Sequence, residues 1–312
     1  MNPKVSIVVP SLNRCDTLAH VLPTLANQTV SRDCFEILLC DTGSTDGTLE
    51  LVSHLHLSNL RVLTAPGLSR GPARNLGIRC AGADLVLFND ADILASPQLV
   101  QRHIEAHARR PGGAIVGCEV RIDSLEEYDA ACGNAPRDRA CGARPAGGRR
   151  RRTLHPAWRR RLAWFFFLTG NASVGRDALE RVGMFDERFT AYGHEDLDLG
   201  YRLRRNGVRI RYEPAAVSYH CHPETLDTRL EKMEASGRAT IRMYRKYRDR
   251  RILWRMGVNP LSRGIHSLLG GRPALGWWRQ RAHSSPFART VALQLAYVSG
   301  AKAEWRESGD SA

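Results

Sequence analysis

Along the first 110 residues, apolar β-branched runs alternate with segments whose apolar positions recur at helical spacing. Runs of the first kind predict short strands, and segments of the second kind predict helices. The predicted strands cover 4–9, 35–41, 60–64 and 84–89, and the predicted helices cover 16–27, 46–55, 70–81 and 97–109. Because strand and helix alternation is typical of a parallel sheet with helices on both faces, the sequence predicts an α/β fold.

This regular pattern stops near Cys132 and gives way to a stretch rich in Gly, Ala, Pro and Arg. We interpret residues 133–161 as a mobile, solvated loop, which is either an insertion without function or a lid that orders over an anionic ligand. Two short strands are then predicted at 208–212 and 217–220. The domain hypothesis is a catalytic domain over 1–222 followed by a basic helical extension over 223–312.

The charge of the chain is unevenly distributed. Its 312 residues carry a net charge of +14, and 43% of them are hydrophobic, which is enough for a packed core. Residues 1–132 have an excess of four negative charges, whereas 133–161 and 223–312 each have an excess of nine positive charges. The loop and the extension are therefore the expected contacts for anionic partners.

Cysteine usage and the lack of long apolar runs indicate the compartment. Eight cysteines are scattered without C-x-x-C pairs, which favours a reducing cytoplasm. Cys221 stands between His220 and His222, but no second pair of soft ligands has the spacing of a zinc site. The apolar run Leu162–Leu168 is far shorter than the roughly 18 residues of a membrane span, and no export leader precedes Val5. We expect a cytoplasmic protein.

An acidic pair follows the predicted strand that ends at Asn89. Asp90 and Asp92 flank Ala91. In an open α/β sheet, ligands bind beyond the carboxyl ends of the strands, and hard oxygen donors there suit Mg²⁺ or Mn²⁺ holding a phosphate. On its own, an Asp-x-Asp sequence is as well explained by a turn or a helix cap.

Polar side chains also follow the three preceding strands. The residues at these joints are Pro10, Leu12, Asn13, Asp41, Gly43, Arg70, Arg74 and Asn75. Asp41 could accept an N–H from a planar ligand, although on its own residue type capping by Asp41 or Asp46 is the more common role. The guanidinium groups of Arg70 and Arg74 at a helix start suit a phosphate or a base carbonyl. All four joints are expected at one edge of the sheet.

Five segments in order resemble those of family 2 glycosyltransferases of the GT-A fold. They are Val5–Asn13, Cys40–Asp46, Ala73–Gly77, Asp90–Asp92 and Gly193–Asp196. The resemblance runs from about residue 5 to 222, and it implies a nucleotide-sugar-binding half over 1–110 and an acceptor-side half over 111–222. It implies a Rossmann-like three-layer sandwich with a mixed, largely parallel central sheet, to which the helical C-terminal extension is added.

The resemblance further implies a nucleotide-sugar donor, most often a UDP-sugar, and an acceptor hydroxyl on a glycan, lipid carrier or natural product. Asp41 would bond the uracil ring beside Pro10, Leu12 and Asn13. Arg70 or Arg74 would approach the base or the diphosphate. Asp90 would face the ribose and the sugar, and could join Asp92 at the metal. Asp92 would coordinate the Mn²⁺ or Mg²⁺ that bridges the diphosphate, a Lewis-acid role worth several kcal/mol.

The second half supplies the acceptor side and the base by the same resemblance. Gly170 and Asn171, and then Tyr192 and Gly193, would line the acceptor site. Asp196 would be the general base of an inverting single displacement, with Glu195 orienting the acceptor. His220 would be the late metal ligand, with His222 as the alternative. Thr42 and His194 depart from common family residues, which bears on the identity of the donor more than on the reaction.

Beyond Pro223 the resemblance fades, and pattern alone remains. Residues 226–248 predict a long, basic, amphipathic helix that packs back on the catalytic domain, followed by tryptophans interleaved with arginines. Such segments also occur on anionic membrane surfaces, so peripheral contact with the inner membrane face is an open alternative for the remainder.

Two other functional classes are open. A sugar nucleotidyltransferase would share the crevice and the metal, but it should carry a Gly-rich, Arg-containing loop where this chain has Pro10–Asn13. A non-catalytic nucleic-acid-binding protein could use the arginines, but an acidic crevice would repel a phosphate backbone. We therefore expect no nucleic-acid partner.

Overall fold

The computed structural model describes residues 3–133, 163–189, 192–220, 225–269 and 272–307. The chain divides into two compact units, which are described separately. The sheet unit comprises Met1–Arg188 and Asp196–His222, and the helical unit comprises Phe189–Glu195 and Pro223–Ala312. Except for Gly133, the predicted loop at 133–161 lies outside the described residues, as does His222.

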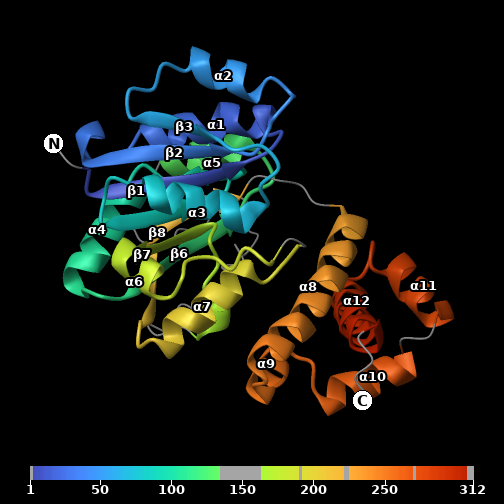
Figure 1. Cartoon of the computed structure of the whole chain (residues 1–312). Coiled ribbons are helices and arrows are strands. Elements are labelled where there is room, and N and C mark those ends of the chain that lie inside the picture. The colour runs from blue at the N-terminus through green and yellow to red at the C-terminus, as the bar shows by residue number, and fades with distance from the viewer. Residues whose placement is uncertain (1–2, 134–162, 190–191, 221–224, 270–271, 308–312) are drawn as a thin grey trace. The chain divides into compact units, whose positions relative to one another are not determined.

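The sheet unit contains one mixed sheet of eight strands in the order β3-β2-β1-β4-β7-β6-β8-β5 (Figure 1). Its strands are β1 (Val5–Ser11), β2 (Phe35–Asp41), β3 (Leu60–Thr64), β4 (Leu85–Asn89), β5 (Ile93–Ala95), β6 (Ala114–Arg121), β7 (Asn171–Gly175) and β8 (Ile210–His220). The pairs among β1 to β4 are parallel, as the alternating pattern predicted, because helices connect these strands. β7 runs antiparallel to both β4 and β6.

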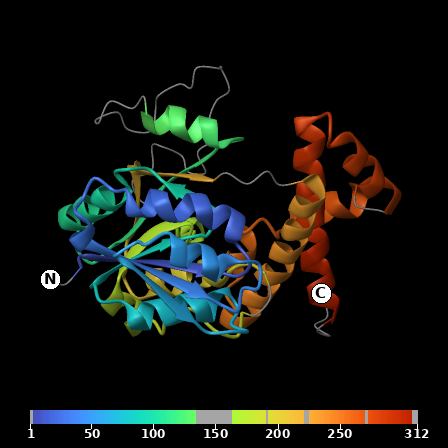
Figure 2. The same ribbon diagram turned by 90° about the horizontal axis from the view of Figure 1, so that it is seen from above.

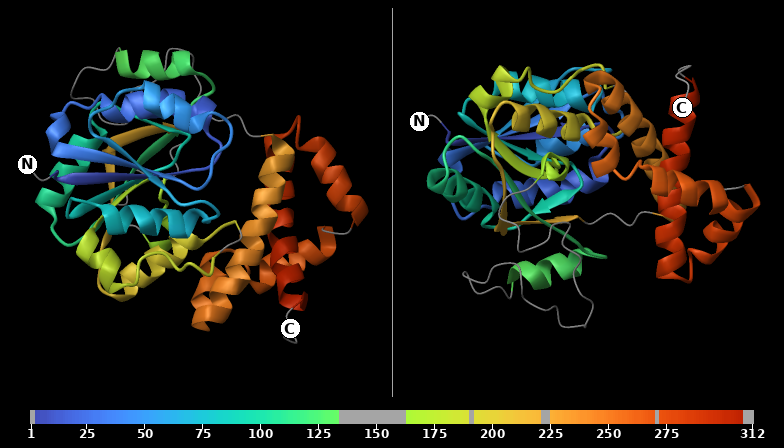
Figure 3. Two further views of the ribbon diagram at one scale, coloured as in Figure 1. Left: turned by 45° about the horizontal axis from the view of Figure 1, so that its top comes forward. Right: turned by 90° about the horizontal axis from the view of Figure 1, so that it is seen from below.

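Helices cover both faces of this sheet, with α1 and α3 on opposite sides (Figures 1 and 3). The helices of the sheet unit are α1 (Cys15–Ala26), α2 (Thr48–His54), α3 (Arg70–Cys80), α4 (Leu99–Arg109), α5 (Leu125–Gly133), α6 (Arg176–Arg181) and α7 (Glu195–Arg205), with short 3₁₀ turns η1 (Arg32–Cys34) and η2 (Trp164–Phe166). α3 approaches β1 so closely that a Cβ on Gly77 would lie 2.4 Å from Val8 Cγ1. The result is the predicted three-layer sandwich.

The strand pairing differs from the sequence prediction at its far end. The two short strands predicted at 208–212 and 217–220 are one strand, β8, which pairs with β6. A register shift between Gly117 and Cys118 absorbs the irregular stretch of β8, so the ladder resumes beyond it instead of ending. The consequence is that β8 reaches His220 beside β5, where Ile93 pairs with His220.

The helical unit is built on two long helices. It contains α8 (Leu226–Tyr247), α9 (Arg250–Arg255), α10 (Pro260–Leu269), α11 (Arg272–Arg281) and α12 (Pro286–Glu307). α8 and α12 lie side by side (Figures 1 and 2), and glycines bring their backbones together. A Cβ on Gly237 would lie 1.9 Å from the carbonyl oxygen of Tyr297. No helix among the described residues is long and apolar enough to cross a membrane.

Candidate active site at the carboxyl ends of the strands

The loops that follow β1 and β2 are joined by hydrogen bonds. Asn13 adopts a left-handed conformation with φ 52°, and its Oδ1 accepts from the backbone N–H of Thr45 at 2.8 Å. The Asp41 carboxylate accepts from the backbone N–H groups of Gly43 and Ser44, each at 3.0 Å. Asp41 is fully buried. It therefore closes the turn that shapes this wall of the crevice, which is the capping role that its residue type alone allowed.

Arg74 holds the first carboxylate of the acidic pair. Its Nη2 donates to Asp90 Oδ1 at 2.7 Å, and its guanidinium lies 5.5 Å from the centroid of the Phe185 ring. Arg74 is 3% exposed, whereas the Asp90 side chain is 37% exposed. A buried cation that donates to a more exposed carboxylate fixes the direction of that carboxylate. Arg70 begins α3 and is exposed.

The second carboxylate of the pair lies beside the histidine that ends β8. Asp92 Oδ2 is 3.6 Å from His220 Nε2, and both side chains are mostly buried. Burial lowers the pKa of His220, but the hydrogen bond and negative charge of Asp92, with the charge of Glu119, outweigh burial and raise it overall. The antiparallel pairing of β5 with β8 creates this contact between residues far apart in sequence.

A third carboxylate, Glu119 on β6, belongs to the same cluster and was not predicted from the sequence. Burial raises the pKa of Glu119, the charge of His220 lowers it, and the charges of Asp90 and Asp92 raise it further. A Cβ placed on Gly170 would lie 3.0 Å from Glu119 Oε2 and 3.6 Å from Asp90 Oδ2. The signal available in the sequence was a charged residue in the otherwise buried part of the run Ala114–Val120.

The acceptor-side segment begins at a position with no room for a side chain. A Cβ on Gly170 would lie 2.5 Å from Ile93 Cδ1. The next residue, Asn171, is buried, and its Nδ2 donates to the carbonyl of Ala216 at 3.0 Å and to Ser218 Oγ at 2.9 Å. His103 Nε2 donates to Asn171 Oδ1 at 2.8 Å. Asn171 thus joins β7, β8 and α4 and supports Gly170 from inside the protein.

Asn75 has a similar internal role. Its Nδ2 donates to the Phe185 carbonyl and to Glu187 Oε1, each at 2.9 Å, and its Oδ1 accepts from the Phe185 N–H at 2.8 Å. Phe185 is the aromatic ring that lies beside the Arg74 guanidinium. Asn75 therefore places the ring that helps to fix Arg74, which in turn holds Asp90.

The predicted base lies at the start of α7. This helix begins at Glu195, so both Glu195 and Asp196 are in its first turn, where the helix dipole favours ionised carboxylates. Glu195 is 8% exposed, and Asp196 is half-buried. Asp196 Oδ1 accepts from the N–H of Leu197 at 2.7 Å. The following turn is fixed by the buried ion pair of Asp198 with Arg202 at 2.8 Å.

The residues just before this acid pair belong to the helical unit. Gly193 and His194 both have positive φ, 103° and 70°. His194 is buried, and its Nε2 lies 2.7 Å from Thr240 Oγ1 on α8. Thr240 Oγ1 also lies 2.5 Å from the hydroxyl of Tyr297 on α12. The exposed ring of Tyr192 lies 5.8 Å from Lys232 Nζ. α8 and α12 therefore hold the backbone immediately ahead of Glu195 and Asp196.

No group of three or more His, Cys, Asp or Glu in the described part of the chain is placed to hold a metal ion by itself. Asp92 and His220 nevertheless supply a carboxylate and an imidazole 3.6 Å apart, a donor set that suits Mn²⁺ and leaves positions for ligand oxygens. Asp90 is engaged by Arg74. The chemistry of these two side chains therefore fits a divalent metal.

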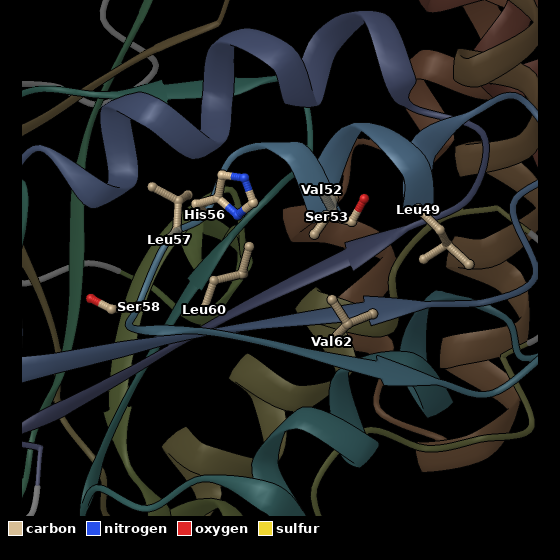
Figure 4. A pocket seen from close by; sticks show the side chains of 8 residues that line it. All are labelled: Leu49, Val52, Ser53, His56, Leu57, Ser58, Leu60 and Val62. Carbon is tan, nitrogen blue, oxygen red and sulfur yellow. The ribbon is translucent and has the colours of Figure 1, made fainter.

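A separate hollow of about 530 Å³ lies between α2 and the edge strand β3 (Figure 4). Its lining residues are Leu49, Val52, Ser53, His56, Leu57, Ser58, Leu60 and Val62. The lining is largely apolar and contains no carboxylate, so it offers nothing for phosphate or metal chemistry. The polar edge described above is the candidate site, although it is not the better-formed hollow.

The family model for Glycosyl transferase family 2 matches residues 6–183, and that for Glycosyl transferase family group 2 matches residues 154–301. The chain belongs to glycosyltransferase family 2. It is 35% identical over 231 residues to validoxylamine A glucosyltransferase of Streptomyces hygroscopicus subsp. jinggangensis, an alignment that covers 66% of this chain and 52% of that protein. It is 30% identical over 241 residues to chondroitin synthase of Escherichia coli, over 70% of this chain and 35% of that protein.

This chain thus spans about half the length, or less, of these curated relatives. Solved structures share its fold. The mannosyltransferase PcManGT of Pyrobaculum calidifontis, in complex with GDP-Man and Mn²⁺, has a TM-score of 0.64 and 18% identity, over 99% of this chain and 89% of that one. S. aureus TarS 1-349 in complex with UDP-GlcNAc has a TM-score of 0.55 and 15% identity, over 98% and 92%. The GT-A fold expected from the sequence is confirmed.

Proposed function

We propose that this glycosyltransferase moves a sugar from a UDP-linked donor to an acceptor hydroxyl, with inversion and with help from Mn²⁺ or Mg²⁺. The observation that carries the proposal is the placement of Asp92 beside His220, at the strand edge where Arg74 fixes Asp90. Support for a nucleotide-sugar donor comes from solved structures of the same fold, whose complexes contain GDP-Man or UDP-GlcNAc.

The donor would lie along the loops that follow β1, β2 and β4. The turn closed by Asp41 and the loop of Pro10, Leu12 and Asn13 would contact the base, with Gly43 allowing its close approach. Asp90, held by Arg74, would face the ribose and sugar. When bound at Asp92 and His220, a divalent metal would neutralise the charge that develops on the departing diphosphate. The exposed Arg70 would add a donor for the phosphates.

The attacking hydroxyl would be deprotonated by Asp196. A carboxylate in the first turn of a helix stays ionised near neutral pH, so it can accept the acceptor proton as the new C–O bond forms. Glu195 would orient the acceptor beside Gly170 and Tyr192. A single displacement at the anomeric carbon inverts its configuration, since no covalent intermediate intervenes.

Two variants separate donor binding from chemistry. Asp92→Ala is expected to remove the Mn²⁺-dependent thermal shift that a UDP-sugar produces. Asp196→Asn should keep that shift and lose transfer by about 100- to 10,000-fold, the usual contribution of a general base. A panel of nucleotide sugars assayed with Mn²⁺ or EDTA identifies the donor. Wild-type transfer by the Asp196 variant would refute the base assignment, and salt-sensitive DNA binding without any turnover would favour the nucleic-acid-binding alternative.

We also propose that the helical unit contacts an anionic membrane surface peripherally. Residues 223–312 carry nine more positive than negative charges. Several large apolar side chains of this unit are exposed, namely Trp254, Leu261, Ile265, Leu268, Leu269, Trp277 and Phe287. Basic helices with exposed aromatic and aliphatic residues bind the interface of anionic bilayers.

A further inference from the structure

The helical unit contains a hollow of about 520 Å³, lined from α8, α9, α10 and α12. One wall is apolar and includes the buried side chains of Ile241, Val258 and Val298. The lining also contains three cationic side chains, those of Arg263, Lys302 and Arg306. An apolar wall with a cationic rim is complementary to a molecule that has an apolar body and an anionic group.

The cationic rim lacks compensating negative charge. No carboxylate among the described residues pairs with Arg263, Lys302 or Arg306. Lys302 Nζ instead donates to neutral groups, to His266 Nδ1 at 2.9 Å and to Ser267 Oγ at 3.1 Å. Burial and the charges of Arg263 and Arg306 lower the pKa of Lys302. The rim therefore presents a positive potential that an anion would neutralise.

The wall also offers an unused hydrogen-bond donor. Trp305 lines the hollow, and its Nε1 is buried without a hydrogen-bond partner. Its ring stacks on Tyr244 with centroids 5.5 Å apart, so the indole is held in place. A buried N–H without an acceptor is costly.

α10 separates this hollow from an exposed apolar face. Arg263, Gly264 and Ser267 line the hollow, while Leu261 and Leu268 are 73% and 84% exposed. Arg263 and Ser267, one turn apart, lie on one side of α10, whereas Gly264 is three residues from Leu261 and four from Leu268 and therefore borders the exposed apolar face. A helix that lies on a bilayer with its apolar face would bring a cationic hollow to the level of the lipid head groups.

We propose that the hollow binds the phosphate-bearing head and adjoining carbons of an anionic phospholipid. The phosphate lies among Arg263, Lys302 and Arg306, and the first carbons of the chains lie on the apolar wall. This inference rests on the peripheral membrane contact proposed above and adds a defined lipid site to it. It is independent of the donor and base assignments in the sheet unit.

Replacing a glycine that lines the hollow with leucine tests the site, and the replacement also raises the helix propensity of α10. A Cβ on Gly264 meets nothing within 4 Å, and the same is true of Gly276 on α11, which does not line the hollow. Gly264→Leu and Gly276→Leu therefore add the same exposed apolar group and the same gain in helix propensity. Flotation with phosphatidylglycerol vesicles should fall about tenfold or more for Gly264→Leu and stay unchanged or rise for Gly276→Leu.

Charge removal provides the second test. Arg263→Gln with Lys302→Gln should weaken binding to phosphatidylglycerol vesicles by about 30-fold, since each cation near an anionic surface contributes about fivefold. The control removes two charges from α7 of the sheet unit, with Arg204→Gln and Arg205→Gln, and should change binding little. Vesicles of phosphatidylcholine should bind weakly to every variant.

The outcomes are distinct. Equal flotation of wild type and Gly264→Leu would overturn the lipid site while leaving peripheral contact standing. Absence of wild-type binding to any vesicle would overturn both. Inorganic phosphate could occupy the hollow while the protein binds phosphatidylglycerol vesicles no better than phosphatidylcholine vesicles. That result would assign the rim to soluble anions and would also overturn the proposal. Sugar transfer to soluble acceptors, measured in the same preparations, tests the enzyme separately.

Discussion

The hydroxyl of Thr240 should hold the backbone that leads into Glu195, because it accepts a hydrogen bond from His194. It donates to the carbonyl of Ser236 at 3.1 Å, so it can accept from His194 Nε2 and from the hydroxyl of Tyr297. Thr240→Val keeps the shape of the side chain and leaves two buried polar groups without partners. Each unpartnered group should lower the free energy of unfolding by about 1–3 kcal/mol. Thr240→Ser keeps the hydroxyl and loses one methyl group, which should lower the free energy of unfolding by about 1 kcal/mol.

The effect on catalysis should exceed the effect on donor binding. His194 precedes Glu195 directly, so loss of its hydrogen bond loosens the start of α7, and a displacement near 1 Å at a catalytic group costs about 100-fold in rate. We expect kcat to fall strongly for Thr240→Val and weakly for Thr240→Ser. The donor KM and the Mn²⁺-dependent thermal shift should stay near wild type for both.

The assay is sugar transfer at a temperature at which urea unfolding shows all three proteins to be more than nine-tenths folded. Tyr297→Phe serves as a second control, because it removes one partner of Thr240 and leaves the contact with His194. Equal kcat values for the Val and Ser variants would refute the reasoning, even if the Val variant were the less stable protein. A matched rise in donor KM would also refute it, by placing the effect in the donor site.

Two further predictions concern stability. Burial lowers the pKa of His103 to about 3 and that of His107 to about 4. Both histidines titrate near pH 6.5 in the unfolded chain, so the unfolded chain binds more protons below that pH. Between pH 6.5 and 4, each histidine should therefore lower the free energy of unfolding by about 1.4 kcal/mol for each pH unit of acidification. Urea unfolding of His103→Gln should show a smaller dependence. Gly237→Ala should destabilise the helical unit by about 3 kcal/mol or more, because its Cβ meets a backbone carbonyl, whereas Gly276→Ala should not lower the melting temperature.

The sequence predicted the parallel half of the fold because each strand there carries a local signal. Between Val5 and Arg109, each repeat of a β-branched run, a turn and a helix takes about 30 residues or fewer. Periodicity alone therefore predicts the order of these elements. The resemblance implied a mixed sheet, but the pattern did not locate the antiparallel pairs of β4 with β7 and of β5 with β8, because these pairs are non-local. β5 has only three residues, and its ladder with β8 joins positions more than a hundred residues apart. That ladder nevertheless brings Asp92 to His220.

The site residues divide in the same way. Asp90 and Asp92 were identified because they follow a buried strand, whereas Glu119 was missed because one glutamate in a strand has no motif around it. The roles predicted for Asn75 and Asn171 remain predictions, but the structure engages both carboxamides inside the protein. A sequence motif identifies positions that must be kept, and it does not distinguish a side chain that touches a ligand from one that supports its neighbour.

His194 illustrates how a residue beside a motif can have a partner that the motif does not reveal. In the sequence it is a departure from the family that bears on donor identity, and its pattern gives no reason to connect it with residues near 240 or 297. In the structure its buried ring, with a pKa lowered by burial to about 4, is neutral at physiological pH and bonds to α8. The tight contact of Gly237 with α12 fixes the same region of α8. A change in the packing of α8 on α12 would therefore reach the backbone that carries His194 and Glu195, which belong to the same helical unit.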